Sequence, residues 1–267
     1  MIDRGKRNVL GVRVDALDYQ AAVERIISAA AAGESYSCTA LAVHGVMTGV
    51  LDSEHRHRLN TFDLVTPDGQ PVRWAINALY RCRLPGRVYG PTLTLHVCAR
   101  AADAGLPIFL FGSRREVVEK LRHRLTTRFP GLEIAGAEPS AFRRLDEADR
   151  QRLLERIRSS GAAITFVGLG CPRQEVFAYE CAGELSMPVI AVGAAFDYHS
   201  GELSEPPSWM QRLGLQWAHR LAQDPRRLWK RYLGLNSLYL VLLALQLTGA
   251  WCPRTEGVAP REMLRYG

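Results

Sequence analysis

The chain has 267 residues, of which 47% are hydrophobic and 23% are charged, a balance that is typical of globular proteins and excludes wholesale disorder. This length is sufficient to bury a sizeable core. The formal net charge of +7 at pH 7 predicts a surface that attracts anions, which include nucleic acid, acidic lipid and phosphorylated small molecules.

Between residues 9 and 192, short β-branched runs alternate with amphipathic stretches, which is the pattern of βαβ units around a largely parallel sheet. The predicted strands are residues 9–14, 36–43, 64–66, 108–111, 133–135, 164–167 and 189–192. The clearest predicted helices are residues 19–32, 115–128 and 147–158, each followed closely by a glycine or a Pro-Gly pair. The sequence therefore predicts an α/β fold with a Rossmann-like, largely parallel sheet and flanking helices.

The pattern changes after Gly201, where the strands stop, two prolines interrupt the chain and a Trp- and Arg-rich stretch begins. We expect residues 1–201 to form the Rossmann-like core and residues 202–267 to form a basic, amphipathic C-terminal appendage. The longest apolar stretch of the appendage is about half of the ~20 residues that span a bilayer. Residues 233–251 therefore predict either an interfacial membrane anchor or a helix packed on the core or in a subunit interface.

The six cysteines form no CxxC pair and no zinc-like spacing, which predicts reduced, mostly buried thiols and a cytoplasmic protein. Residues 1–13 contain no apolar run of the kind found in signal peptides, so we expect no export. The sequence also lacks a DxD pair that would hold a divalent ion against a diphosphate, so we expect neither a metal nor a cofactor. Six histidines fall at no metal-ligand spacing: His44, His55, His57, His96, His123 and His199.

Three junctions place small residues where a predicted strand turns into a helix: TPDGQP (66–71), FGSRRE (111–116) and VGLGCPRQE (167–175). A helix N-terminus presents unpaired N–H groups and a partial positive charge, so phosphate oxygens bind there readily. Ser113 is expected to cap the helix of the second junction. The expected ligand-binding residues at these junctions are Gly112, Ser113, Gly168, Gly170 and Arg173.

Asp68 follows a predicted strand and precedes Gly69, which places its carboxylate in a turn at the same sheet edge. Two interpretations are open for it: a helix cap or turn residue, or a general base that takes the proton of a substrate hydroxyl. The basic segment 219–233 forms either a solvated helix face or a cluster that neutralises a leaving phosphate. Its cations are Arg220, Arg226, Arg227, Lys230 and Arg231.

Six ordered motifs run through residues 9–233: PDGQPVRW, RVYGPTL, LFGS, VGLGCPRQE, VGAAFDYHSG and PPSWMQRLGLQWAHRLAQDPRRLWKRYL. Together they resemble the WecG/TagA/CpsF family, glycosyltransferase family 26. The resemblance implies an inverting enzyme that moves a hexose from a UDP-sugar to a polyprenyl diphosphate-linked acceptor in cell-surface polysaccharide biosynthesis. The hexose would be N-acetylmannosamine, its uronic acid, glucose or a similar sugar. The resemblance also implies a catalytic core over residues 1–201 and an appendage that contacts the membrane and closes the active site.

The resemblance assigns roles to particular positions. It implies that Asp68 is the catalytic base and that Arg87 and Gln174 are further active-site residues. Arg220 and Arg227 match appendage arginines that meet the donor diphosphate. The expected partners are thus a UDP-sugar, a polyprenyl diphosphate-linked acceptor and the anionic inner face of the cell membrane, where the protein would be peripheral.

Three motifs depart from the family pattern. The family's early Thr-x-Asn is replaced by alanines, which leaves a neighbouring threonine and a histidine as candidate sugar contacts, and the usual Arg-Ala-Pro begins here with glutamate. A lysine also stands where the family has arginine, which turns a bidentate phosphate contact into a point charge that the next arginine can support. The residues concerned are Ala40 and Ala42 with Thr39 and His44, Glu205, and Lys230 with Arg231.

Two functions from other classes compete with glycosyl transfer. The basic charge is compatible with a nucleic-acid-binding protein, but no recognisable binding module is present, so we expect no nucleic acid partner. The run VGLGCPRQE is compatible with a nicotinamide-dependent enzyme, but Arg173 occupies the third glycine position of GxGxxG. A homo-oligomer is compatible with the α/β core, and the sequence does not set a subunit number.

Overall fold

The structure of the protein is a computed structural model, which describes residues 1–223 and 225–267. A few side chains of the C-terminal helices also lie outside the described part: Ser208, Arg227, Leu228, Lys230, Arg231 and Tyr232. The anion contacts predicted for Arg227, Lys230 and Arg231 are therefore outside the described residues and stay predictions.

Six parallel strands form the central sheet in the order β4-β3-β8-β7-β5-β6. They are β3 (Tyr36–Leu41), β4 (Leu64–Pro67), β5 (Ile108–Gly112), β6 (Ile134–Glu138), β7 (Ile164–Gly168) and β8 (Pro188–Ala191). These bounds lie close to those of the six predicted strands from residue 36 onward, which confirms the α/β fold class. Because all six strands are parallel, their carboxyl ends meet at one edge of the sheet.

The helices of the core follow the strands as βαβ units require. Helix α1 begins where the Asp18 carboxylate accepts the Ala21 N–H at 2.9 Å and ends at Gly33, whose φ of +63° suits glycine. The predicted helices 19–32 and 115–128 are confirmed, and the third is one residue longer than predicted. The core helices are α1 (Tyr19–Ala32), α2 (Val43–Leu51), α3 (Ser53–Thr61), α4 (Gln70–Tyr80), α5 (Gly90–Ala104), α6 (Arg115–Arg128), α7 (Glu147–Ser159), α8 (Arg173–Cys181) and α9 (Ala195–Ser200).

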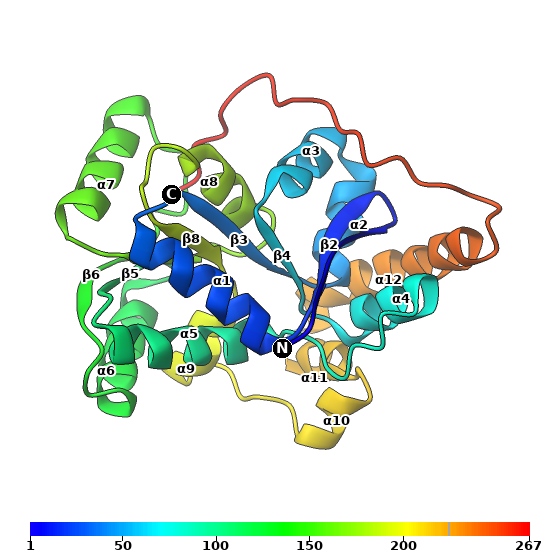
Figure 1. The fold of residues 1–267 in the computed structure, drawn as a ribbon, viewed down its shortest axis with the longest axis horizontal. Coiled ribbons are helices and arrows are strands. Elements are labelled where there is room, and N and C mark those ends of the chain that lie inside the picture. Colours follow the sequence, from blue (N-terminus) through cyan, green and yellow to red (C-terminus); the bar gives the residue numbers. More distant parts are fainter. Residues whose placement is uncertain (224) are drawn as a thin grey trace.

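Side chains of the sheet alternate between two hydrophobic cores, one on each face. In β5, Ile108 and Leu110 belong to one core, whereas Phe109 and Phe111 belong to the other. Helices α1, α5, α6 and α9 cover the first face, and α2, α3, α4, α7 and α8 cover the second (Figure 1). The result is a three-layer arrangement in which the sheet is buried on both sides.

The prediction of one strand over residues 9–14 is wrong. The chain forms an antiparallel hairpin outside the main sheet, with β1 (Asp3–Val9) paired to β2 (Val12–Leu17). Leu10 and Gly11, with φ values of +55° and +94°, make the two-residue turn that such hairpins favour. The turn was not predicted because Leu10 is apolar, so the pattern of residues 9–14 is that of one uninterrupted strand.

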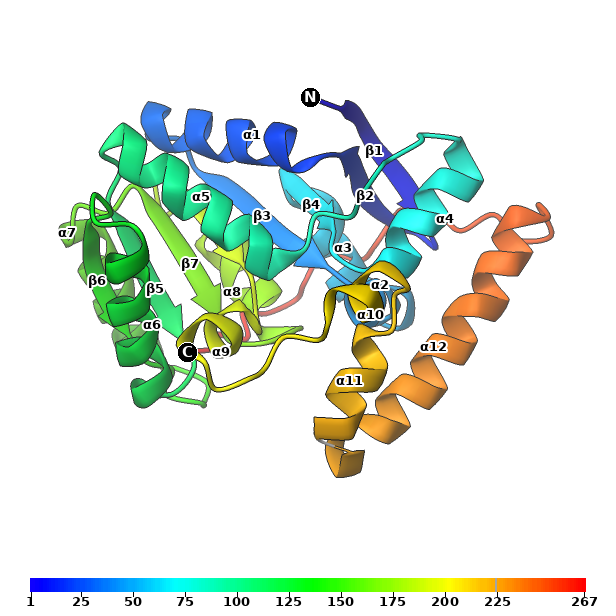
Figure 2. The same ribbon diagram turned by 90° about the horizontal axis from the view of Figure 1, so that it is seen from below.

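Residues 202–267 contain helices α10 (Ser208–Arg212), α11 (Gln216–Gln223) and α12 (Pro225–Leu247), followed by an extended tail. Helix α12 packs against α2 and α4 (Figure 2), and its buried Tyr239 donates a hydrogen bond to the Pro71 carbonyl at 3.1 Å. The tail returns over the core (Figure 1), where the N–H groups of Leu264 and Arg265 donate to the Glu180 carboxylate. No helix of the described residues combines the length and the apolar character needed to cross a membrane.

Candidate active site

The carboxyl edge of the sheet gathers most of the residues that the sequence singled out. Asp68 follows β4, Ser113 follows β5, and Gly170 and Gln174 follow β7. Ligands of open α/β sheets bind at this edge. The edge is therefore the place to test whether these residues form one site.

Asp68 lies in the turn between β4 and α4, and its half-buried carboxylate contacts the start of helix α5. Its Oδ1 atom accepts the N–H of Gly90, the first residue of that helix, at 3.3 Å, and its own N–H donates to the Leu41 carbonyl at 3.2 Å. Burial raises the pKa of the carboxyl to about 6, although the charges of Arg87 and Arg220 act in the opposite direction. A carboxylate with this pKa is ionised at neutral pH and is a stronger base than an ordinary aspartate.

Arg87 is buried between the core and the appendage. Its guanidinium donates to Oε1 of Gln216 and to Oε1 of Gln211, the latter at 3.4 Å, and lies 4.1 Å from the ring centroid of Tyr89. Arg87 thus connects α10 and α11 to the loop that precedes α5, and its charge reaches Asp68. The two glutamines were missed from the sequence, although both stand in the motif PPSWMQRLGLQW.

Three side-chain polar atoms of α4 and α11 are buried and have no hydrogen-bond partner among the described residues: Gln70 Oε1, Gln216 Nε2 and His219 Nδ1. Gln70 comes from α4 and donates through Nε2 to the Gln211 carbonyl at 3.5 Å, whereas the other two come from α11. Folded proteins leave few buried polar groups unpaired, and such groups often face a ligand or water. These atoms are therefore candidate ligand contacts between core and appendage.

Gln174 and Thr39 are joined through a third residue, Glu175. The Gln174 amide donates to Glu175 Oε1 at 2.8 Å, and the Thr39 hydroxyl donates to the same oxygen at 3.0 Å. Oε1 of Gln174 accepts the N–H of Gly170 at 3.1 Å. Gln174 is 3% exposed and Thr39 is fully buried, so in this structure both support Glu175 from within the protein. Burial raises the pKa of Glu175, the last residue of the motif VGLGCPRQE.

The glycines predicted to contact phosphate allow the strands and α9 to pack closely. A Cβ atom on Gly112 would lie 2.7 Å from the carbonyl carbon of Gly168, and a Cβ on Gly168 would lie 2.7 Å from the Phe196 ring. Gly112 also has φ of +118°, which other residues rarely adopt. Both glycines are thus required by packing, and their role toward a ligand stays a prediction.

Ser113 does not cap helix α6, which corrects the prediction. The cap residue is Arg114, and Ser113 instead adopts φ of +57° with its N–H donating to the Gly168 carbonyl at 3.0 Å. This conformation turns the hydroxyl toward Asp197, with which it forms a hydrogen bond. The strand-to-helix turn at this position is therefore held by a side chain from α9.

Asp197 is a second carboxyl that the sequence analysis missed. Burial raises its pKa, while Arg220, Arg114 and the Ser113 hydroxyl act in the opposite direction. The same Arg220 also lowers the pKa of Asp68, so this arginine of α11 brings positive charge to both carboxyls. Asp197 stands in the motif VGAAFDYHSG, which was the signal in the sequence that could have revealed it.

Two other predicted substrate contacts, Arg173 and His44, lie in the first turns of α8 and α2. Arg173 is exposed in the first turn of α8, with its guanidinium 5.7 Å from the ring centroid of Tyr266 in the C-terminal tail. His44 is half-buried in the first turn of α2. Their roles toward a substrate stay predictions.

One group of side chains could hold a metal ion among the residues that the structure describes. The ligand atoms of His55, Cys171 and Glu175 lie within 4.8 Å of one another. The three residues are distant along the chain, so the absence of a metal-ligand spacing in the sequence could not reveal them. None of the six cysteines forms a disulfide in the structure, and four of them are buried.

A protein-family model matches most of the chain. Residues 7–252 match the model of the Glycosyl transferase WecG/TagA/CpsF family, a range that includes the core, the carboxyl-edge residues and the helices of the appendage. A match over nearly the whole chain confirms the resemblance seen in the six ordered motifs. The chain belongs to the Glycosyl transferase WecG/TagA/CpsF family.

Proposed function

We propose that the protein is an inverting hexosyltransferase that uses a UDP-sugar donor and a polyprenyl diphosphate-linked acceptor. Family membership makes the chain a glycosyltransferase of cell-surface polysaccharide biosynthesis, and the family in general uses a sugar nucleotide and a lipid-linked acceptor. The observation that carries the finer proposal is Asp68, a half-buried carboxyl with a pKa of about 6 on which the charges of Arg87 and Arg220 act. This combination places a proton acceptor beside positive charge at the ligand-binding edge.

Asp68 acts as the general base in a single displacement. It takes the proton of the acceptor hydroxyl while that oxygen forms a bond to the anomeric carbon of the donor sugar. The bond between the anomeric carbon and the diphosphate oxygen breaks in the same step, and UDP leaves with the electron pair. Attack opposite the leaving group inverts the anomeric configuration.

Arg220 stabilises the negative charge that develops on the departing diphosphate. The charge of Arg220 acts on both Asp68 and Asp197, which supports this role, because a guanidinium at this edge attracts phosphate oxygens. Arg87, by contrast, is held by Gln211 and Gln216 and keeps the appendage against the core. Two atoms that have no hydrogen-bond partner among the described residues, Gln216 Nε2 and His219 Nδ1, are then contacts for the bound substrates.

A UDP-release assay tests the proposed reaction. The full chain is incubated with a panel of UDP-hexoses and a synthetic polyprenyl diphosphate-linked sugar, and UDP is measured over time. We expect UDP release that depends on the acceptor and is fastest with one donor of the panel. Binding of a nicotinamide dinucleotide or of RNA, without UDP release for any donor, would instead support one of the two alternative functions.

The appendage supports a further part of the proposal, contact with an anionic membrane surface at the inner face of the cell membrane. Its helices carry several exposed apolar side chains, and the chain has a net charge of +7. Helix α12 packs one face on the core, as one interpretation of residues 233–251 predicted, and leaves apolar side chains on the other. Among the described residues of these helices and the turn after α10, the exposed large apolar residues are Trp209, Leu213, Trp217, Trp229, Leu233, Leu238, Leu240, Val241, Leu245 and Leu247.

Replacing two of these side chains together, Leu240→Glu and Val241→Glu, should weaken binding to anionic vesicles at least ~10-fold, because each loses the gain of apolar burial. Both residues are more than half exposed, at 62% and 56%, so the fold should be preserved. Flotation with vesicles containing phosphatidylglycerol measures the effect, and Phe142→Glu, 57% exposed on another part of the surface, is the matched control. Equal binding of the double variant and the control would contradict a role of α12 at the membrane.

A further inference from the structure

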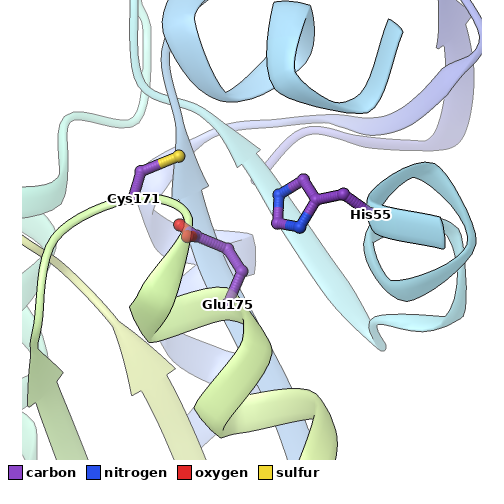
Figure 3. A group of neighbouring side chains, drawn as sticks. All are labelled: His55, Cys171 and Glu175. Carbon is purple, nitrogen blue, oxygen red and sulfur yellow. The ribbon is translucent and has the colours of Figure 1, made fainter. Parts of the chain in front are cut away.

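Three side chains with metal-binding atoms converge from separate segments of the fold. His55 comes from α3, Cys171 from the loop after β7, and Glu175 from the first turn of α8 (Figure 3). Their ligand atoms lie within 4.8 Å of one another. The three residues, which we call the HCE cluster, take no part in the proposed transfer reaction.

Two atoms of the HCE cluster are buried without a hydrogen-bond partner among the described residues. They are Nε2 of His55 and Oε2 of Glu175, and each side chain is 1% exposed. Two unpaired buried polar atoms beside one thiol are unusual, since folded proteins pair nearly all such groups. A single ion or molecule bound to both atoms would supply the missing partners.

The surroundings of Glu175 resemble the supporting shell of a metal ligand. Its Oε1 atom accepts hydrogen bonds from Thr39 at 3.0 Å and from Gln174 at 2.8 Å, which fixes the carboxylate and leaves Oε2 for another partner. Ligating carboxylates are commonly held in this way by hydrogen bonds to their second oxygen. Cys171 also forms a side-chain hydrogen bond to Glu175, so the thiol already points toward the carboxylate.

The position of His55 is fixed by the start of its helix. The helix that carries it starts at Asp52, whose carboxylate accepts the His55 N–H at 3.0 Å and fixes this first turn.

We propose that the HCE cluster binds one divalent transition metal ion, for which Zn²⁺ is the best match. Sulfur, imidazole nitrogen and carboxylate oxygen are the ligands of Zn²⁺, whereas Mg²⁺ and Ca²⁺ prefer oxygen alone. Zn²⁺ with one thiolate, one carboxylate and one neutral imidazole carries no net charge, which lowers the cost of burying the ion. Binding releases the thiol proton to solvent.

Three protein ligands leave one position of a tetrahedral ion for a solvent molecule. The ion would join α3, the loop after β7 and the start of α8, and it would hold Gln174 through Glu175. This inference does not depend on the transfer reaction, because it concerns metal binding by residues outside the proposed chemistry. Its test therefore reads metal binding directly.

The test titrates the full chain, freed of metal by a chelator, with Co²⁺ and then Zn²⁺. We expect one equivalent of Co²⁺ to give tetrahedral ligand-field bands together with a thiolate charge-transfer band, and Zn²⁺ to displace it. Cys171→Ser should remove the charge-transfer band and weaken Zn²⁺ binding at least ~100-fold. Thr39→Val, which removes a hydrogen bond to the ligating carboxylate, should weaken binding ~10- to 100-fold while keeping the band.

Cys252→Ser is the matched control, because Cys252 is an exposed thiol outside the HCE cluster and its loss should leave the spectrum and the affinity unchanged. Circular dichroism of each metal-free variant establishes that it is folded. The proposal is overturned if the folded wild-type chain binds less than one equivalent of Co²⁺ or Zn²⁺. It is equally overturned if the charge-transfer band persists in Cys171→Ser or disappears in Cys252→Ser.

Discussion

Replacing Asp68 with asparagine should lower kcat/KM at least ~100-fold, because the variant has no carboxylate to accept the acceptor proton. The affinity for UDP should stay within about twofold, since the amide keeps the shape of the side chain and can still accept the Gly90 N–H. The UDP-release assay measures the rate, and calorimetry measures UDP affinity. Asp103→Asn, at an exposed position on α5, is the control and should retain full activity.

The same variant should be more stable than the wild type at neutral pH, which separates lost chemistry from lost folding. Burial raises the pKa of Asp68 from 3.8 to about 6, so ionisation costs the folded state more than the unfolded state. A shift of about two units corresponds to about 3 kcal/mol. The gain in the free energy of unfolding of Asp68→Asn should therefore be absent below about pH 4. It should grow between about pH 4 and pH 6 and be complete above about pH 6.

Thermal melting at pH 4 and pH 8 measures this difference, and we expect a higher melting temperature of the variant at pH 8 alone. Turnover of Asp68→Asn close to that of the wild type would contradict the assignment of the base. A lower stability of Asp68→Asn than of the wild type at pH 8 would contradict the raised pKa of the Asp68 carboxyl.

Replacing Arg220 with alanine should lower kcat about 10²- to 10³-fold, the range found when one group that stabilises developing negative charge is removed. The variant should also change the pH dependence of kcat/KM, which reports the free enzyme. The charge of Arg220 lowers the pKa of Asp68, so its removal raises that pKa further. The acid limb of the profile, expected near pH 6 in the wild type, should therefore move to higher pH.

Rates from pH 5 to pH 9 measure both effects. Arg212→Ala, which removes an exposed arginine from the neighbouring helix α10, is the matched control and should change neither the rate nor the profile. An acid limb that stays in place in Arg220→Ala would show that this arginine does not act on Asp68. Unchanged kcat would remove it from the leaving-group site.

The sequence by itself determined the α/β class and the carboxyl-edge position of Asp68, because both depend on short-range patterns. Apolar runs such as residues 164–168 and stop signals such as Gly33 mark elements whose bounds the structure reproduces closely. A strand end followed by a turn places Asp68 at the ligand edge wherever the strand sits in the sheet. The hairpin turn at Leu10–Gly11 was not predicted, because its first residue is a buried leucine rather than one of the polar residues that usually mark such turns.

Tertiary structure alone decided which side chains meet across the edge. Arg87 with Gln211 and Gln216 comes together only when the appendage docks on the core, because no local pattern encodes that contact. The same holds for the HCE cluster, which α3, the loop after β7 and α8 assemble from distant parts of the chain. Burial then sets the pKa of Asp68, since the dielectric environment of a carboxyl depends on everything packed around it and not on its neighbours in sequence.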